Sequence, residues 1–152
     1  MAYIKVGGKA PDFTLQSNKG ESVTLSEFFG KKNVVLFFYP MDESPVCARE
    51  ARAFRNAYKI FNQLEAEVLG VSSQDVQSHR TFASHCNLPF ILLSDPDSKV
   101  RKLYNACTTL GAFPKRVTFV IGKDGFVKHV FSSQFRPSRH ADEAVRALKT
   151  LV

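Results

Sequence analysis

The sequence lacks several features that define other classes of protein. It contains no tryptophan, no internal repeat and no low-complexity segment, and no apolar run approaches the roughly 18–20 residues that a membrane-spanning helix needs. The first residues lack the apolar core of a secretory signal. We therefore expect no export and no membrane partner, and a cytoplasmic location, or an organellar one if a transit peptide has been removed.

Cysteine is scarce. The three thiols, Cys47, Cys86 and Cys107, are too few and too far apart for the disulfide framework of a small secreted domain. None belongs to a C-x-x-C pair or to a cysteine–histidine spacing typical of zinc, so we expect no metal site. The low count indicates a reducing compartment, and the question becomes whether one thiol is reactive.

Acidic residues are fewer than basic ones, 14 against 21, which gives a net charge of +7. The basic residues are scattered, and they form neither a run of five or more nor an aromatic–basic motif for binding RNA. We therefore expect no nucleic-acid partner and interpret the charge as a field that attracts anions.

The order of apolar segments indicates an α/β protein. Its 152 residues, 44% of them apolar, are enough for one domain with a core, and we expect a single domain over 1–152. The expected elements are hairpins over 12–25 and 118–131, a helical turn at 26–30, strands at 34–39, 67–72 and 91–94, and helices at 45–65, 76–87, 95–105 and 139–151. This order predicts a thioredoxin-like fold with an N-terminal β-hairpin extension, in which α/β/α layers surround a mixed sheet and the first two buried strands are parallel neighbours or near neighbours.

Cys47 occupies a position where chemistry is expected. It lies in the first turn of the helix after the most apolar strand, and sites in α/β sheets gather beyond the carboxyl ends of strands. Ser44 is the expected N-cap, with Pro45 at the first helical position. Free backbone N–H groups around Val46 and Cys47 favour the thiolate and can bind an oxygen. The alternative is that Cys47 is only a small buried apolar residue.

The segment YPMDESPVC at residues 39–47 resembles the active-site motif of the peroxiredoxins, with Pro40, Ser44 and Cys47 at the motif positions. Glu50 matches an acidic residue of the bacterioferritin-comigratory-protein, or peroxiredoxin Q, subfamily. Similar stretches at 69–72, 88–90, 92–97 and 116–121 extend the resemblance along nearly the whole chain.

This resemblance implies a thiol-dependent peroxidase that reduces hydrogen peroxide and alkyl hydroperoxides without a cofactor, with thioredoxin or a similar dithiol protein as reductant. Cys47 would become a sulfenic acid, and Ser44 would hold the peroxide. Arg116, by resemblance the family's active-site arginine, would hold the thiolate and stabilise the transition state. Glu50 would orient Arg116, and Pro40 would shield the site from water.

Each of these residues also has a structural explanation. Ser44 would then be only a helix cap, and Pro40 only the end of a strand. Arg116 would be a solvated charge, and Glu50 a surface partner of another arginine. With a structural Cys47 the chain would be a non-catalytic thioredoxin-like binding module. A thiol–disulfide oxidoreductase is the third alternative, disfavoured because serine stands where C-x-x-C has its first cysteine.

The sulfenic acid must be reduced before the next turnover. Many members of the subfamily carry a resolving cysteine at a position that is Arg52 here, and some carry it on the helix after the second buried strand. Cys86 lies on that helix and is the first candidate, Cys107 the second and an external thiol the third. A bond to Cys86 would require the Cys47 helix to unwind at its start, because disulfides need Cα atoms within about 7 Å.

Two further expectations follow. Because most relatives in the subfamily are monomers, we expect a monomer. The four histidines show no metal-ligand spacing and no link to the reactive cysteine, so we expect them on the surface or at helix ends; they are His79, His85, His129 and His140.

Overall fold

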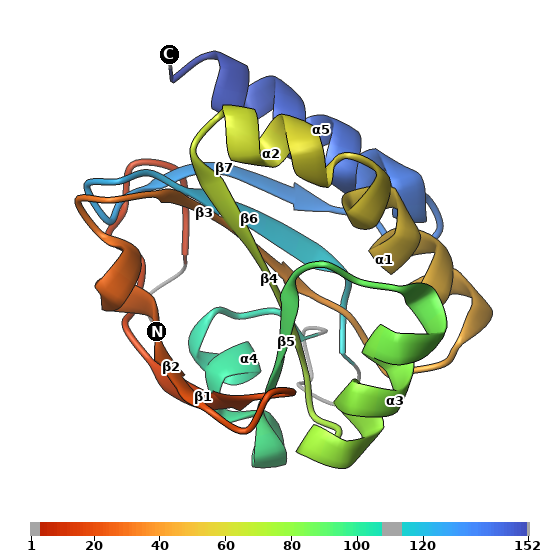
Figure 1. The fold of residues 1–152 in the computed structure, drawn as a ribbon. Coiled ribbons are helices and arrows are strands. Elements are labelled where there is room, and N and C mark those ends of the chain that lie inside the picture. The colour runs from red at the N-terminus through yellow and green to blue at the C-terminus, as the bar shows by residue number, and fades with distance from the viewer. Residues whose placement is uncertain (1–3, 108–113, 152) are drawn as a thin grey trace.

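The computed structural model describes residues 4–107 and 114–151 (Figure 1). Its centre is a mixed seven-stranded sheet in the order β2-β1-β5-β4-β3-β6-β7. The strands are β1 (Thr14–Ser17), β2 (Ser22–Thr24), β3 (Asn33–Phe38), β4 (Ala66–Ser72), β5 (Ile91–Ser94), β6 (Val117–Ile121) and β7 (Val127–Ser132). The helices are α1 (Pro45–Asn56), α2 (Tyr58–Gln63), α3 (Val76–Cys86), α4 (Lys99–Leu103) and α5 (Pro137–Lys149), with short 3₁₀ helices η1 (Leu25–Phe28) and η2 (Pro96–Ser98).

The two most apolar strands lie side by side at the centre of the sheet. β3 and β4 are parallel, with Val35 opposite Val68 and Phe37 opposite Gly70, and β3 pairs with antiparallel β6 on its other edge. A Cβ atom on Gly70 would lie 2.7 Å from Phe37, so this glycine makes room for the ring beside it. The predicted parallel pairing is therefore confirmed.

Alternate side chains of β3 enter two separate cores, as the period of two in a strand requires. Val35 and Phe37 face the layer formed by α1, α2, α3 and α5, whereas Leu36 and Phe38 face the N-terminal segment, η1 and α4 (Figure 1). Phe37 stacks on Phe54 of α1 with the ring centroids 4.3 Å apart. Each fully buried side chain of this size contributes ~1.5–3 kcal/mol, so both faces of the sheet hold the layers together.

Two predicted helices are interrupted. The helix expected over 45–65 divides at Ala57, which has φ −96° and ψ 3°. This break lets Phe61 of α2 pack against Phe54 of α1 in one core. The helix expected over 95–105 begins as η2, and α4 starts only at Lys99, because Asp97 and Ser98 have left-handed backbone angles, with φ 63° and 56°. The Asp95 carboxylate accepts hydrogen bonds from the amides of Val100 and Arg101 in the first turn of α4. None of the described helices is long and apolar enough to cross a membrane.

Candidate active site

Cys47 is fixed by the junction between β3 and α1. β3 ends at Phe38, and half-buried Pro40, which has no N–H to donate to a ladder, follows directly in the loop. Ser44 has extended backbone angles and is the N-cap of α1, and its Oγ accepts a hydrogen bond from the Cys47 amide at 3.1 Å. The thiol therefore lies in the first turn of the helix, as predicted, and it is buried.

Arg116 reaches the thiol from the neighbouring strand. Because Phe38 pairs with Val117 of β6, Arg116 lies just beyond the carboxyl end of β3. Its Nη1 lies 3.1 Å from Cys47 Sγ and 3.0 Å from Glu50 Oε1. Its Nε donates to the Gln134 carbonyl oxygen at 3.1 Å, which fixes the guanidinium plane. The structure thus brings together Cys47, Glu50 and Arg116, three of the residues singled out from the sequence.

The carboxyl group of Glu50, close to the thiol, has a strongly shifted pKa. It lies one turn after Cys47 on α1 and is fully buried. Burial raises the pKa of Glu50 to about 8, although the Arg116 charge and hydrogen bond act in the opposite direction. Oε1 accepts from Arg116, whereas Oε2 has no hydrogen-bond partner and lies 3.6 Å from His140 Nδ1. Burial thus favours the protonated form of this carboxyl group.

Two hydrogen-bond donors next to Cys47 are not used within the described part of the protein. The Ser44 oxygen accepts from the Cys47 amide, so its own proton is free to donate elsewhere. The Val46 amide, at the second position of α1, has no acceptor among the described residues. The expectation of free N–H groups thus holds for Val46, but the Cys47 amide is occupied by the cap. The two donors can bind an oxygen atom next to the sulfur.

The other thiols lie in different surroundings. Cys86, near the end of α3, is buried in the same core as Cys47, and burial raises its pKa although the Arg52 charge opposes this. Arg55 of α1 donates from Nη1 to the Cys86 carbonyl oxygen at 2.8 Å, which ties the two helices together. Cys107 is half-buried and borders a polar hollow of about 470 Å³ next to Arg101. All three thiols are free.

A second buried network holds the loop before Cys47. Tyr39 donates to Asp42 Oδ1 and Ser78 to Oδ2, each at 2.7 Å. His79 Nδ1 lies 2.7 Å from Asp42 Oδ2, and its Nε2 donates to the Leu93 carbonyl oxygen at 3.0 Å. Both ring nitrogens of His79 therefore face acceptor oxygens, and the ring and the Asp42 carboxylate form a buried pair. Burial alone would raise the pKa of Asp42, but the hydrogen bonds from His79 and Tyr39 lower it.

The placement predicted for the histidines is wrong for two of the four. His79 and His140 are completely buried, each in contact with a carboxyl group near Cys47. The signal was present in the helical register, because His79 shares a stripe with Phe82, and His140 shares one with Ala144. His85 is exposed at the end of α3, as expected.

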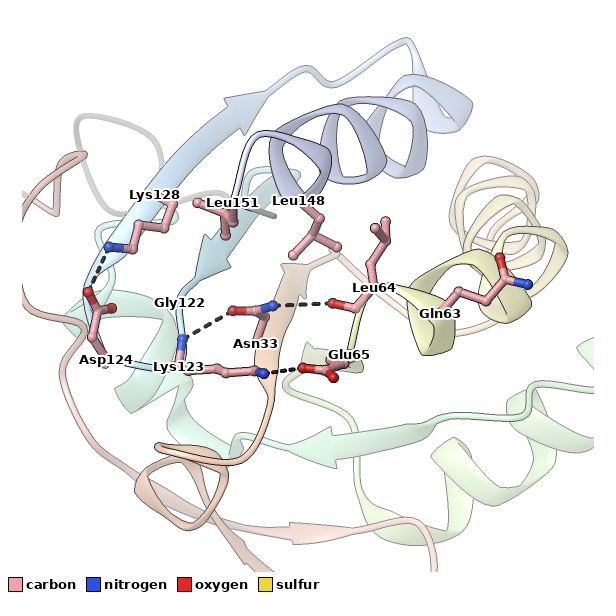
Figure 2. A pocket seen from close by; sticks show the side chains of 10 residues that line it. All are labelled: Asn33, Gln63, Leu64, Glu65, Gly122, Lys123, Asp124, Lys128, Leu148 and Leu151. Carbon is pink, nitrogen blue, oxygen red and sulfur yellow. Dashed lines mark hydrogen bonds and ion pairs between the residues drawn. The ribbon is translucent and has the colours of Figure 1, made fainter.

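A cavity of about 450 Å³ lies at the opposite end of the sheet, where β3 begins (Figure 2). Its charged lining groups are already paired: Lys128 Nζ lies 2.7 Å from Asp124 Oδ2, and Lys123 binds Glu65. No thiol lines this cavity. Within 4–107 and 114–151 there is also no group of three or more side chains able to hold a metal ion. The reactive groups therefore gather at the Cys47 end.

Comparison with known proteins agrees with this geometry. The AhpC/TSA family profile matches residues 6–130. The chloroplastic peroxiredoxin Q of Sedum lineare is 44% identical, over 99% of this chain and 81% of that protein. The chloroplastic peroxiredoxin Q of Arabidopsis thaliana is 46% identical, over 97% of this chain and 68% of that protein. The solved Mycobacterium tuberculosis peroxidoxin BcpB has a TM-score of 0.91 at 35% identity and covers 99% of both chains. A cysteine-to-serine variant of Xylella fastidiosa PrxQ has a TM-score of 0.89 at 28% identity, with the same coverage.

The chain belongs to the AhpC/TSA family, since both the family profile and the relatives cover most of it. It is a thiol-dependent peroxidase. Within the family its similarity is to peroxiredoxin Q and the bacterioferritin comigratory proteins. The resemblance seen at residues 39–47 and the predicted thioredoxin-like fold are thereby confirmed.

Proposed function

We propose that Cys47 is the peroxidatic cysteine for hydrogen peroxide and alkyl hydroperoxides, assisted by Arg116, Glu50, Ser44 and Pro40. The observation that carries this proposal is the 3.1 Å contact between Arg116 Nη1 and Cys47 Sγ in the first turn of α1. A buried guanidinium at this distance stabilises the thiolate, which is the nucleophilic form of cysteine.

The reaction transfers one oxygen atom to sulfur. The Cys47 thiolate attacks one peroxide oxygen, an S–O bond forms and the O–O bond breaks. The leaving hydroxide or alkoxide takes a proton from solvent, and sulfenic acid remains on Cys47. Negative charge moves from the sulfur to the leaving oxygen, so donors are needed on both sides. Arg116 serves the sulfur, and the free Ser44 hydroxyl and Val46 amide serve the peroxide.

Glu50 and Pro40 support the reaction without touching the peroxide. Glu50 Oε1 binds the same Nη1 of Arg116 that contacts the sulfur, so it fixes where the positive charge lies. Pro40 is half-buried at the end of β3 and excludes water from the loop that leads to Cys47. Both residues therefore preorganise the site.

Cys86 is the resolving cysteine in this proposal. It shares the core of Cys47, and its raised pKa keeps it as a thiol that does not compete for peroxide. Formation of the disulfide requires the first turn of α1 to unwind so that Cys47 can approach Cys86. The bond from Arg55 in the last turn of α1 to the Cys86 carbonyl holds the end of α3 in place meanwhile, whereas the 2.7 Å pair between Glu43 and His85 ties down the loop that must move. A thioredoxin-type dithiol protein then reduces the disulfide.

Cys47→Ser and Cys107→Ser are the matched variants for the peroxidase test. With thioredoxin, its reductase and NADPH present, we expect peroxide consumption to disappear in Cys47→Ser and to persist in Cys107→Ser. Activity in Cys47→Ser would disprove the assignment of the nucleophile.

The resolving step needs a separate measurement. Mass spectrometry after one equivalent of peroxide is expected to show an intramolecular disulfide in the wild type and none in Cys86→Ser. A disulfide that persists in Cys86→Ser would move the role to Cys107, and a wild type without any internal disulfide would indicate an external thiol.

The remaining expectations also belong to this proposal. We expect a monomer, without a nucleic-acid partner, in the cytoplasm or in an organelle. The curated relatives cited above are chloroplastic by name. Light scattering of the reduced and oxidised protein tests the oligomeric state, and a dimer in the reduced form would contradict it.

A further inference from the structure

We propose that Glu50 holds a proton on Oε2 behind the Arg116–Cys47 contact, and that the neutral ring of His140 beside it is a positioning residue that keeps Glu50 uncharged. This inference rests on the proposed role of Cys47 and extends it to a residue on α5. It starts from a buried oxygen, Glu50 Oε2, that has no hydrogen-bond partner.

The hydrogen bonds of His140 fix its tautomer. Its Nε2 lies 2.9 Å from the Ser133 carbonyl oxygen, which can only accept, so Nε2 carries a proton. Burial and the Arg116 charge lower the pKa of His140, which leaves Nδ1 without a proton at neutral pH. The lone pair of Nδ1 therefore faces Thr118 Oγ1 at 2.8 Å and Glu50 Oε2 at 3.6 Å.

A lone pair 3.6 Å from Glu50 Oε2 favours the protonated carboxyl group, because the lone pair repels the negative charge of a carboxylate and attracts the positive end of an O–H group. Oε1 is already bound to Arg116, so the proton belongs on Oε2. Both side chains are completely inaccessible to bulk solvent.

The charges around the pair explain why one proton is held. Three basic side chains face Glu50: Arg116 from the start of β6, Arg101 from α4 and His140 from α5. The Cys47 thiol lies on the same helix as Glu50 and contacts the same Arg116. One buried guanidinium contacts both Cys47 and Glu50. When Glu50 is protonated, Arg116 compensates the Cys47 thiolate; when Glu50 is ionised, the two anions compete for it.

This arrangement makes the reactivity of Cys47 fall at alkaline pH. The rate constant for Cys47 oxidation by hydrogen peroxide, followed by stopped flow between pH 6 and 10, is expected to fall as the pair loses its proton. Glu50→Gln stays uncharged, so we expect this alkaline limb to be absent.

Two further variants are expected to shift the limb in opposite directions. His140→Phe removes the acceptor and shifts the limb to lower pH, whereas Thr118→Val removes the competitor for Nδ1 and shifts it to higher pH. The shift expected for one hydrogen bond is about one pH unit. His129→Gln is the control, because His129 lies half-buried on β7 and binds Glu143 instead. Its pH profile is expected to match the wild type.

Infrared spectroscopy tests the proton without any turnover. At pH 7 the wild type is expected to show the C=O stretching band of a protonated carboxyl group that is missing in Glu50→Gln. Absence of this band, or an alkaline limb unchanged in Glu50→Gln and Thr118→Val, would overturn the proposal. A wild type that does not consume peroxide would instead refute the proposed role of Cys47. The infrared band would in that case still show whether Glu50 is protonated.

Discussion

The two ends of the central sheet hold their charged groups in different surroundings. Beyond the carboxyl end of β3, Arg116, Glu50 and His140 are buried; Arg116 contacts both Cys47 Sγ and Glu50 Oε1, and His140 lies behind Glu50. At the end where β3 begins, Lys128 and Asp124 lie at the rim of a cavity, accessible to water and paired with each other (Figure 2).

The end of the sheet that holds Cys47 is therefore distinguished by the burial of its charged groups and not by the size of a cavity. Solvent-exposed ion pairs contribute about 0–1 kcal/mol, because water screens them. In the buried cluster one guanidinium must compensate two acidic groups, so a change in one group changes the ionisation of the other. This difference between the two ends can be tested with three variants: Arg116→Met, Asp42→Asn and Lys128→Met.

The largest effect is expected from Arg116→Met. It removes the charge next to Cys47 Sγ, so the rate constant for oxidation by peroxide is expected to fall by about 10²–10³-fold, as for other oxyanion-stabilising groups. Stopped-flow measurement of the first oxidation step gives this value. Arg146→Ala, an exposed arginine of α5, serves as the control, and an equal loss there would contradict the role of Arg116.

Asp42→Asn is expected to act mainly on stability. It removes one partner of the buried pair with His79 and costs about 3 kcal/mol of unfolding free energy, whereas Glu43→Gln in the same loop is expected to cost about 0.5 kcal/mol or less. Urea denaturation of both variants gives the two values. A cost for Asp42→Asn no greater than that for Glu43→Gln would show that the pair does not stabilise the loop.

The same carboxylate is expected to determine how the free energy of unfolding falls at acid pH. The pKa of Asp42 is lowered from its ordinary 3.8, so its contribution is complete above that value and is lost as the pH falls through the lower native pKa. Asp42→Asn is therefore expected to have a flatter stability profile below about pH 4. Denaturation between pH 2 and 5 measures this, and parallel profiles would count against the ion pair.

The smallest effect is expected at the other end of the sheet. Lys128→Met breaks an exposed pair with Asp124, so the peroxidase rate is expected to stay unchanged and the stability to change by about 0.5 kcal/mol or less. Steady-state kinetics and urea denaturation check both values. A loss of activity comparable to that of Arg116→Met would remove the distinction between the two ends.

Local signals in the sequence predicted most of the fold. The apolar runs of β3 and β4 predicted a buried parallel pair, and Ser44-Pro45 predicted the start of α1. The break at Ala57 could not be predicted, because no glycine or proline marks it and the packing of Phe61 on Phe54 determines it.

The site was predicted where its residues are neighbours in sequence. Cys47 and Ser44 were recognisable from their place at a helix start, but Arg116 lies 69 positions from Cys47 and was found only through the family resemblance. The helical register signalled the burial of two histidines, but their partners could not be predicted because these carboxyl groups lie far away in the chain. His79 binds Asp42, 37 positions away, and His140 faces Glu50.

Trapping the oxidised sulfur tests the central claim most directly. The Cys86→Ser variant is treated with one equivalent of hydrogen peroxide in the presence of dimedone, which labels sulfenic acids, and peptide mass spectrometry locates the label. If Cys47 is the peroxidatic cysteine, the label is expected on the peptide that contains Cys47. A label only on the peptide that contains Cys107, or none while peroxide is consumed, would contradict it.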